Sequence, residues 1–364
     1  MFLDNLSVDR SGLSRNATLE DLEGRLISIL RSRNEQHCNA MRSGAQRIAV
    51  SLDREREYAL LDTMMGSILG TRPGHKAKTP TARAMAMGID YDRLTLFDLL
   101  VKALQETPLT ALPNSVKTDD AKRNFAFLES YFSNYIEGTK FPIDQAIGIA
   151  LRGDVAIGRP MGARDLVGVY NHARDAGLRA LTMPQTEAVL AAVQEHHLRM
   201  MLVRAEIDPG AFKTVPNMAG NHTFVHPDLV RETLCAGVKK LGDVFPGSAR
   251  ALLAMLVFVE VHPFNDGNGR LARLLMNAEL THAGESRIII PTLYRDEYLD
   301  GLRAMTQQRD PTTYIRMMRM AQEWTASFDY SDLQTVIAQM KRCNAFEENR
   351  TEFLLLNRNE QRIR

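Results

Sequence analysis

Twelve consecutive residues hold most of the side chains in this sequence that could do chemistry. The run is His262-Pro-Phe-Asn-Asp-Gly-Asn-Gly-Arg-Leu-Ala-Arg273. An imidazole can accept a proton near neutral pH, and the carboxylate of Asp266 suits Mg²⁺. Arginine binds phosphate through paired hydrogen bonds. Together these residue types indicate chemistry on a nucleotide phosphate, and they do so without a P-loop, because no Gly-x4-Gly-Lys-Ser/Thr occurs.

The first half of the run is expected to end a helix. Ser248 can cap the N-terminus of a helix over residues 248–261, which is rich in apolar side chains. Pro263 prevents this helix from continuing past His262. The sequence therefore places the imidazole at a helix C-terminus, where a loop begins.

The second half of the run predicts a site for phosphate. Gly267 and Gly269 allow backbone N–H groups to converge on one point. Arg270 is expected to begin a second helix, over residues 270–281, whose N-terminus faces the same point. Arg270 and Arg273 are three residues apart and therefore lie on one face of that helix. The pattern predicts a phosphate cradle with two guanidinium groups.

Each of these features also has an ordinary structural interpretation. A histidine before proline can cap or pack, Asp-Gly-Asn-Gly is a common turn, and two arginines at this spacing can form a solvated face. A calcium loop of the EF-hand type is excluded, because Arg270 stands where a ligand is needed and no Glu closes the loop. The occurrence of all the features in order within twelve residues favours the functional interpretation.

The remaining sequence predicts helix nearly everywhere. A capping box at Thr18–Asp21 begins a helix that reaches about Arg33. A loop rich in glycine, proline and positive charge follows at residues 70–80. The other expected helices cover residues 53–69, 94–104, 119–135, 142–151, 163–176, 186–203 and 227–241. One hairpin is expected over residues 212–225, around Asn217–Asn221, and residues 332–364 are expected to form one helix and a polar tail.

Composition narrows the class of protein. The 364 residues are 45% hydrophobic and 24% charged, which is typical of a globular protein. The 45 basic and 44 acidic residues nearly balance, so nothing in the net charge favours nucleic acid or an anionic membrane as a partner. Three dispersed cysteines and the lack of a signal peptide predict a cytoplasmic location.

The run from His262 to Arg273 resembles the signature of the Fic family at every position. The family implies an all-α fold, a Fic-type helical bundle with a small β-hairpin flap, here with an additional N-terminal helical region. It also implies a protein adenylyltransferase, which moves AMP from ATP to a Ser, Thr or Tyr hydroxyl of a target protein and releases pyrophosphate. The related Doc-type kinases lack the intact Gly-Asn-Gly-Arg, so its presence favours nucleotide transfer.

The resemblance assigns a role to each position of the run. His262 is implied to be the general base that deprotonates the target hydroxyl, and Asp266 is implied to hold Mg²⁺. Phe264 is implied to be a buried anchor of the loop. The implied nucleotide and phosphate ligands are Gly267, Asn268 and Gly269, which form the anion hole, and Arg270 and Arg273, which bind the tail phosphates.

A second segment, Ser133-Asn-Tyr-Ile-Glu-Gly138, resembles the inhibitory helix motif of Fic proteins. Ser133 and Glu137 are four residues apart, so they project from one face of a helix, and Gly138 can follow its C-terminus. The family implies that Glu137 forms a salt bridge with Arg273 and displaces the γ-phosphate. The alternative interpretation is a charged residue near a helix end.

The hairpin at residues 212–225 lies where Fic proteins carry a flap. The resemblance implies that its border, Lys213, Thr214 and Val215, binds the backbone of the target as an added strand. Lys213 stands where arginine is more usual. A purely structural hairpin is the alternative. Four histidines nearby are interpreted as surface or core residues, because neither HExxH nor a cysteine partner accompanies them: His196, His197, His222 and His226.

These assignments divide the chain into three parts. Residues 1–115 form an N-terminal helical region, 116–330 the Fic domain with its inhibitory helix at about 119–138, and 331–364 a C-terminal helix and tail. The N-terminal hundred residues carry no motif that we assign to a family, and the region is expected either to recognise the target or to mediate self-association into a homodimer.

The expected partners are ATP and an unknown target protein, with the chain itself as a second target through auto-modification. Two further functions stay open. The first is a de-AMPylating hydrolase that uses the same site, with Glu137 orienting a water. The second is a nucleotide-sensing interaction module with little catalysis.

Overall fold

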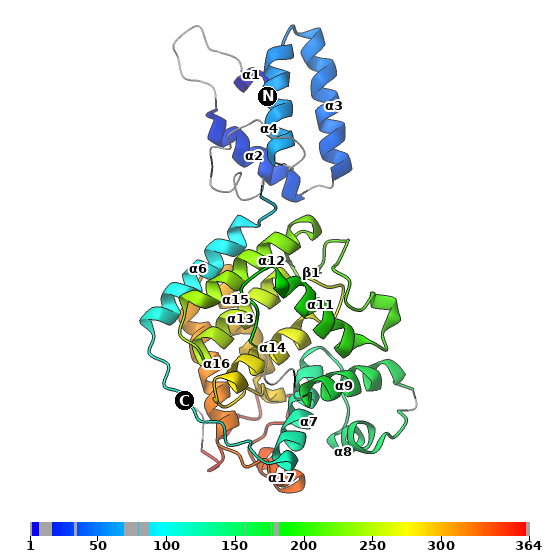
Figure 1. Cartoon of the computed structure of the whole chain (residues 1–364), viewed down its shortest axis with the longest axis vertical. Helices are drawn as coiled ribbons and strands as arrows, with labels where there is room; N and C mark the ends of the chain where they lie inside the picture. Colours follow the sequence, from blue (N-terminus) through cyan, green and yellow to red (C-terminus); the bar gives the residue numbers. More distant parts are fainter. Residues whose placement is uncertain are drawn as a thin grey trace. The chain divides into compact units, whose positions relative to one another are not determined.

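The computed structural model describes residues 2–6, 17–32, 35–68, 79, 87–156, 158–175, 177 and 182–361 (Figure 1). The chain divides into two compact units. The first comprises Met1–Leu94 together with Val225–Thr233, and the second comprises Thr95–Phe224 and Leu234–Arg364. No helix in the described ranges combines the length and the apolar character needed to cross a bilayer.

The first unit is helical. It contains α1 (Phe2–Leu6), α2 (Leu19–Ser32), α3 (Glu35–Ser51) and α4 (Glu55–Ile68), whose apolar faces share one core that includes Leu26, Met64 and Met65. The predicted capping box is confirmed, because the Asp21 N–H donates to Thr18 Oγ1 (3.1 Å) and the Thr18 N–H donates to Asp21 Oδ2 (2.9 Å). Helix α3 was not predicted from the sequence. The loop expected at residues 70–80 lies outside the described residues except for Thr79.

The second unit is a helical bundle, as predicted. Its α-helices are α6 (Tyr91–Glu106, which begins in the first unit), α7 (Asp119–Ile136), α8 (Ile143–Ile147), α9 (Pro160–Ala173), α11 (Ala188–Met201), α12 (Val230–Lys239, which also begins in the first unit), α13 (Ser248–Val261), α14 (Asn268–His282), α15 (Arg295–Gln308), α16 (Pro311–Ala326) and α17 (Leu333–Arg342). A π-helical turn (Gly148–Arg152) extends α8, and short 3₁₀ turns cover Ala205–Ile207, Lys240–Asp243 and Thr292–Tyr294; a further 3₁₀ turn, Pro227–Leu229, belongs to the first unit.

Helices α13 and α14 form the centre of the second unit, and Figure 1 shows the other helices around them. Nearly every side chain of α13 is buried, and so is nearly every side chain of α14 from Asn268 to Leu280. A helix that is apolar all round must be covered on all sides, which explains why α13 lies inside the bundle. The twelve-residue run comprises the loop between these two helices, residues 262–267, and the start of α14, residues 268–273.

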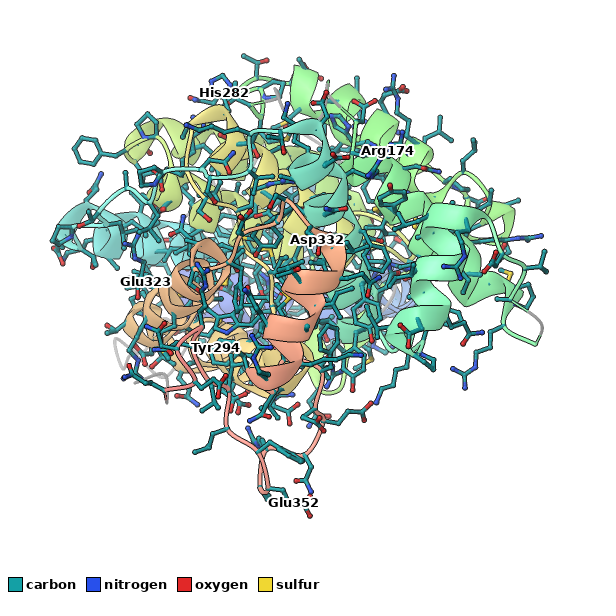
Figure 2. The ribbon with its side chains drawn as sticks, turned by 90° about the horizontal axis from the view of Figure 1, so that it is seen from below. Arg174, His282, Tyr294, Glu323, Asp332 and Glu352 are labelled. Atoms are coloured by element: carbon teal, nitrogen blue, oxygen red, sulfur yellow. The ribbon has the colours of Figure 1, made fainter. Side chains whose placement is uncertain are left out.

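The C-terminal segment packs on one end of the bundle. Figure 2 labels Asp332 at the start of α17; this residue is the N-cap just before the helix, and its carboxylate accepts from the Thr335 N–H (2.8 Å). The turn before α17 is attached to α7, because Asn124 Nδ2 donates to the Tyr330 carbonyl (2.9 Å). Trp324 Nε1 donates to the Leu356 carbonyl (2.9 Å) and fixes the tail. The predicted helix and tail are both present.

The predicted hairpin is confirmed, although its strands are two residues each. Strand β1 (Met218–Ala219) pairs antiparallel with β2 (His222–Thr223), and Met218 lies opposite Thr223. Gly220 has φ +57° in the two-residue turn, a conformation that favours glycine. Strand β1 lies inside the segment 217–221 that was predicted to be the turn, because the residues before it are bound to the motif loop instead.

Candidate active site

His262 ends α13 in a left-handed conformation, with φ +48° and ψ +60°. Such a conformation is uncommon for a residue other than glycine, and it often marks a functional position. Nδ1 lies 3.1 Å from the Val259 carbonyl, to which it donates its hydrogen. The ring stacks on Phe224 at a centroid distance of 3.6 Å. This arrangement fixes the tautomer and leaves Nε2 as a proton acceptor.

The His262 imidazole is neutral at physiological pH. Burial lowers its pKa to about 4, and the nearby charge of Lys213 acts in the same direction. The hydrogen bond to Val259 and the charges of Glu137 and Glu260 oppose the shift without cancelling it. An imidazole held neutral can take a proton directly from a hydroxyl group.

Asn268 locks the motif loop by bridging both backbone groups of Phe264. Its Oδ1 accepts from the Phe264 N–H and its Nδ2 donates to the Phe264 carbonyl, each at 2.8 Å. The Phe264 ring is fully buried. The side chain of Asn268 therefore shapes the loop, which leaves the contribution of this residue to an anion hole to its backbone N–H.

Asn268→Ala should lower the free energy of unfolding by roughly 1–3 kcal/mol, because the buried Phe264 N–H loses its acceptor, while the Phe264 carbonyl keeps a bond from Asn217 Nδ2. Urea unfolding would measure the change. The matched control is Asn265→Ala, which removes one exposed bond to the Ile207 carbonyl and should have a small effect. Asn268→Asp keeps the acceptor but sets a carboxylate oxygen against the Phe264 carbonyl, so it should also destabilise the protein. Wild-type stability in Asn268→Ala would contradict this role.

His197 supports the loop from α11. Its ring stacks on Phe264 at 3.8 Å with an interplanar angle of 4°. Nδ1 accepts from the Gly210 N–H (2.9 Å), so Nε2 carries the hydrogen and donates to the Asp266 carbonyl (2.9 Å). Burial lowers the pKa of His197 to about 4 and keeps the ring neutral for this pairing. This histidine is a core residue, as the sequence analysis interpreted it, but its contacts make it part of the site.

The anion cradle begins at the N-terminus of α14. This helix starts at Asn268, two residues earlier than predicted, and Gly267 precedes it with φ +77°. The first-turn N–H groups of a helix have no partner inside the helix and attract anions. Gly269 lets the side chain of Glu137 approach the first turn of α14 closely, because a Cβ at this position would lie only 2.4 Å from Glu137 Oε1.

Arg270 is buried, with its side chain 3% exposed. Its NH2 donates to Asp266 Oδ1 (3.0 Å), and its NH1 lies 2.8 Å from Asp165 Oδ2 in an ion pair without hydrogen-bond alignment. Its Nε has no hydrogen-bond acceptor among the described residues. Because a buried donor without an acceptor is costly, this geometry favours an anionic ligand such as a phosphate.

Asp266 is the candidate metal ligand, and its side chain is 43% exposed. Burial raises the pKa of its carboxyl, but Arg270, the Gly267 N–H and Arg204 outweigh burial, so the pKa is lowered and the group is ionised. The described residues contain no group of three or more metal-binding side chains. A single accessible carboxylate nevertheless fits Mg²⁺ that is bound mainly through phosphate oxygens.

Arg273 is fully engaged by the C-terminal end of α7. Its Nε donates to Ser133 Oγ (2.9 Å), and its NH2 donates to the Ser133 carbonyl (2.9 Å) and to Glu137 Oε1 (2.6 Å). Its NH1 lies 3.4 Å from the Tyr298 hydroxyl. Burial raises the pKa of Glu137, but the charge of Arg273 outweighs it, so the pKa is lowered and the carboxylate is ionised.

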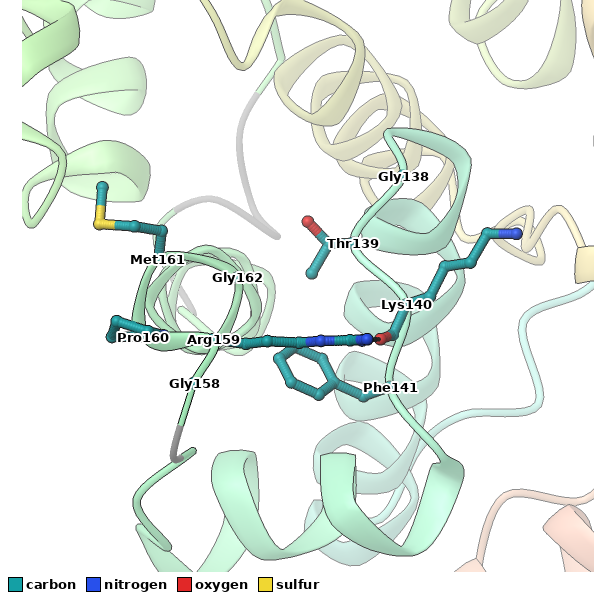
Figure 3. A pocket seen from close by; sticks show the side chains of 9 residues that line it. All are labelled: Gly138, Thr139, Lys140, Phe141, Gly158, Arg159, Pro160, Met161 and Gly162. Atoms are coloured by element: carbon teal, nitrogen blue, oxygen red, sulfur yellow. Dashed lines mark hydrogen bonds between the residues drawn. The ribbon is translucent and has the colours of Figure 1, made fainter.

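A pocket of about 460 Å³ lies just beyond Glu137. It is bounded by residues Gly138–Phe141 and Gly158–Gly162, and no residue of the run His262–Arg273 lines it. Figure 3 shows Arg159 extended above the ring of Phe141, with NH1 donating to the Lys140 carbonyl (2.6 Å). This bond ties the turn after α7 to the first turn of α9.

The border of the hairpin is anchored beside the motif. The Lys213 N–H donates to the Pro263 carbonyl (2.9 Å), and its buried Nζ donates to Asn217 Oδ1 (2.7 Å). Asn217 Nδ2 in turn donates to the Phe264 carbonyl (3.0 Å). Thr214 and Val215 are exposed and lie outside the two strands. The structure thus places Lys213 inside the protein and the other two residues at the surface.

The structure brings together Ser133, Glu137 and every residue of the motif to which a role was assigned. It adds residues that sequence reasoning did not find: Asp165, Arg204, Asn217 and Phe224. Asp165 and Arg204 have no spacing relative to the motif that would reveal them. They reach it because α9 packs against α11, and α11 packs against α14.

The profile of the Fic/DOC family matches residues 186–280, which contain the motif and the hairpin. A Fido domain-containing protein of Dictyostelium discoideum is 33% identical over 102 residues, which are 27% of this chain and 71% of that protein. The chain therefore belongs to the Fic/DOC family.

Two further comparisons extend beyond the motif. The protein adenylyltransferase fic-1 of Caenorhabditis briggsae is 28% identical over 224 residues, 60% of this chain. The chain spans only 43% of the length of that relative. The solved structure of Fic-1, residues 134–508, from C. elegans is similar over 88% of this chain and 97% of that one, with 19% identity and a TM-score of 0.46.

Proposed function

We propose that this chain is a self-inhibited protein adenylyltransferase, which moves AMP from ATP to a Ser, Thr or Tyr hydroxyl and releases pyrophosphate. The observation that carries the proposal is a neutral His262 with Nε2 available as acceptor, held at the end of α13 beside the anion cradle that begins α14. A base next to a phosphate site is the arrangement that this transfer requires.

The residues act on the substrate in a defined order. Nε2 of His262 accepts the hydroxyl proton while the hydroxyl oxygen attacks the α-phosphorus. The bond from the α-phosphorus to the bridging oxygen breaks, and the pyrophosphate leaves with the electron pair. The first-turn N–H groups of α14 stabilise the charge on the α-phosphate, and the guanidinium groups of Arg270 and Arg273 hold the tail.

Asp266 would hold Mg²⁺ together with the phosphate oxygens. The ion supplies charge neutralisation to the phosphates when bound. Without the ion, the positive charges of Arg270 and Arg204 balance the Asp266 carboxylate.

The contact between Glu137 and Arg273 supports self-inhibition. Glu137 occupies the guanidinium group that the tail of ATP needs, and its Oε1 lies against Gly269 in the cradle. ATP must displace a charge-assisted hydrogen bond before its tail can bind there. The target would reach His262 along the exposed border at Thr214 and Val215, and the chain itself is a second target through auto-modification.

Incubation with labelled ATP and Mg²⁺ tests the reaction. The chain would act as its own acceptor, and cell extract would supply other targets. We expect protein-bound label from α-labelled ATP and none from γ-labelled ATP. EDTA should abolish the signal if Mg²⁺ is required. Transfer of the γ-label would mean a kinase-like reaction and would refute the proposal.

A further inference from the structure

We infer that Asp165 is a positioning residue of this nucleotide site, which orients Arg270 toward the phosphates by binding Arg270 and Arg204 with one carboxylate. The inference rests on the proposed function. It adds a residue on α9, outside the motif, to the machinery that binds the tail of ATP.

The carboxylate of Asp165 is shared by two guanidinium groups. Its Oδ2 lies 2.8 Å from Arg270 NH1, and Arg204 NH1 donates to both of its oxygens at 2.8 Å. The side chain of Asp165 is only 7% exposed. A buried carboxylate between the buried Arg270 and the partly exposed Arg204 is stabilised by these two charges, so its position is tightly constrained.

Asp165, on α9, is the more buried of the two acidic partners of Arg270. The other partner, Asp266, is 43% exposed and lies on the loop, where it would turn toward Mg²⁺. Once Asp266 is engaged elsewhere, Asp165 is the remaining carboxylate that holds the guanidinium plane. The unpartnered Nε of Arg270 is then presented in a fixed direction to a phosphate oxygen.

Arg204 neutralises the rest of the cluster. Besides its bonds to Asp165, its Nε donates to Glu206, and its NH2 lies 3.6 Å from Asp266 Oδ2. Arg204 follows α11 and precedes the hairpin. The carboxylate of Asp165 therefore joins α9, the start of α14 and the segment that leads to the hairpin.

Helix α9 is firmly packed, which makes it a suitable support. Ser130 Oγ of α7 donates to the Leu166 carbonyl (2.8 Å), next to Asp165 in the chain. On the other side, Gly168 lets α9 approach α11 so closely that a Cβ there would lie 2.2 Å from the Met200 carbonyl oxygen. This contact brings Arg204, which follows α11, within reach of Asp165.

The test compares two nucleotides in the Glu137→Gly background. Calorimetry would give the Kd for ATP, which uses the tail donors, and for AMP, which does not. We expect Asp165→Asn to raise the Kd for ATP at least about tenfold, because a misplaced Arg270 would lose one charge-assisted hydrogen bond to a phosphate oxygen. The Kd for AMP should change less than about twofold.

Further variants separate positioning from folding. Asp165→Asn leaves an extra buried cation, so the double variant Asp165→Asn with Arg204→Gln restores the charge balance and should still bind ATP weakly. Asp165→Glu keeps the carboxylate and should recover part of the affinity. The matched control is Asp154→Asn, which removes an exposed pair with Arg152 and should change neither Kd.

The outcomes are distinct. Unchanged ATP affinity in the folded double variant, or equal losses for ATP and AMP, would overturn the role of Asp165. Failure of the Glu137→Gly parent to bind ATP would instead overturn the proposed function.

Discussion

The Glu137→Gly variant is expected to transfer AMP about 10- to 100-fold faster than the wild-type chain at subsaturating ATP. Arg273 NH2 loses its carboxylate partner and gains a phosphate oxygen in its place, and one hydrogen bond to a charged group corresponds to a factor of this size. Glycine is compatible with the position, because Glu137 is already the C-cap of α7 and Gly138 follows it with φ +87°. Label from α-labelled ATP measures the rate.

Three further variants test whether activation comes from the loss of the contact between Glu137 and Arg273. Glu137→Gln keeps the shape of the side chain but not its charge, so it should activate less than glycine does. Ser133→Ala removes the acceptor of Arg273 Nε and should activate weakly, because the Ser133 carbonyl remains. Glu195→Gln removes an exposed pair with Arg199 on α11 and should leave the rate unchanged. If Glu137→Gly and the wild type show equal rates across an ATP titration, Glu137 is not inhibitory. The proposed transfer reaction would be unaffected by that result.

The helix, loop and helix around the motif could be predicted because their signals are local. The apolar run of α13, the proline that ends it and the glycines before α14 each act on their own backbone. The start of α14 was predicted two residues late, because Asn268 looks like a turn residue. Its side chain instead bonds back to Phe264, which commits the backbone to the helix.

Helix α3 shows where local signals are weak. Gly44 and several polar residues interrupt its apolar pattern, and glycine inside a helix costs about 1 kcal/mol relative to alanine. Packing against α4 and α2 outweighs that cost, and the isolated sequence does not show this packing.

Contacts across long stretches of sequence could be predicted only in part. Spacing placed Ser133 and Glu137 on one face of α7, and both contact Arg273. The backbone carbonyl of Ser133, which also accepts from Arg273, leaves no trace in the sequence. The same holds for Asp165, since a lone aspartate on α9 gains its meaning from two arginines that are 39 and 105 positions away.

The His262→Ala variant is expected to lose transfer almost completely in the Glu137→Gly background. Removal of a general base lowers a rate by roughly 10²–10⁴-fold. ATP binding should persist, because the donors of the cradle and the two arginines come from other residues. Calorimetry for ATP and α-label for transfer would measure the two properties separately. Joint loss of binding and transfer would show that His262 supports the loop and does not act as a base.

The pH profile tests the same role without changing His262. Only the neutral imidazole can accept the proton, so the rate should fall as pH falls through the pKa of His262 in the folded protein. Burial lowers this pKa from 6.5 to about 4, so the rate should stay level from pH 8 to about 5 and decline only below that. The Glu137→Gly variant lacks one negative charge that raises the pKa of His262, so the pH at which its rate declines should not be higher than in the wild type. An acid limb near pH 6.5 would contradict the buried, neutral base, because that is where an imidazole exposed to water titrates.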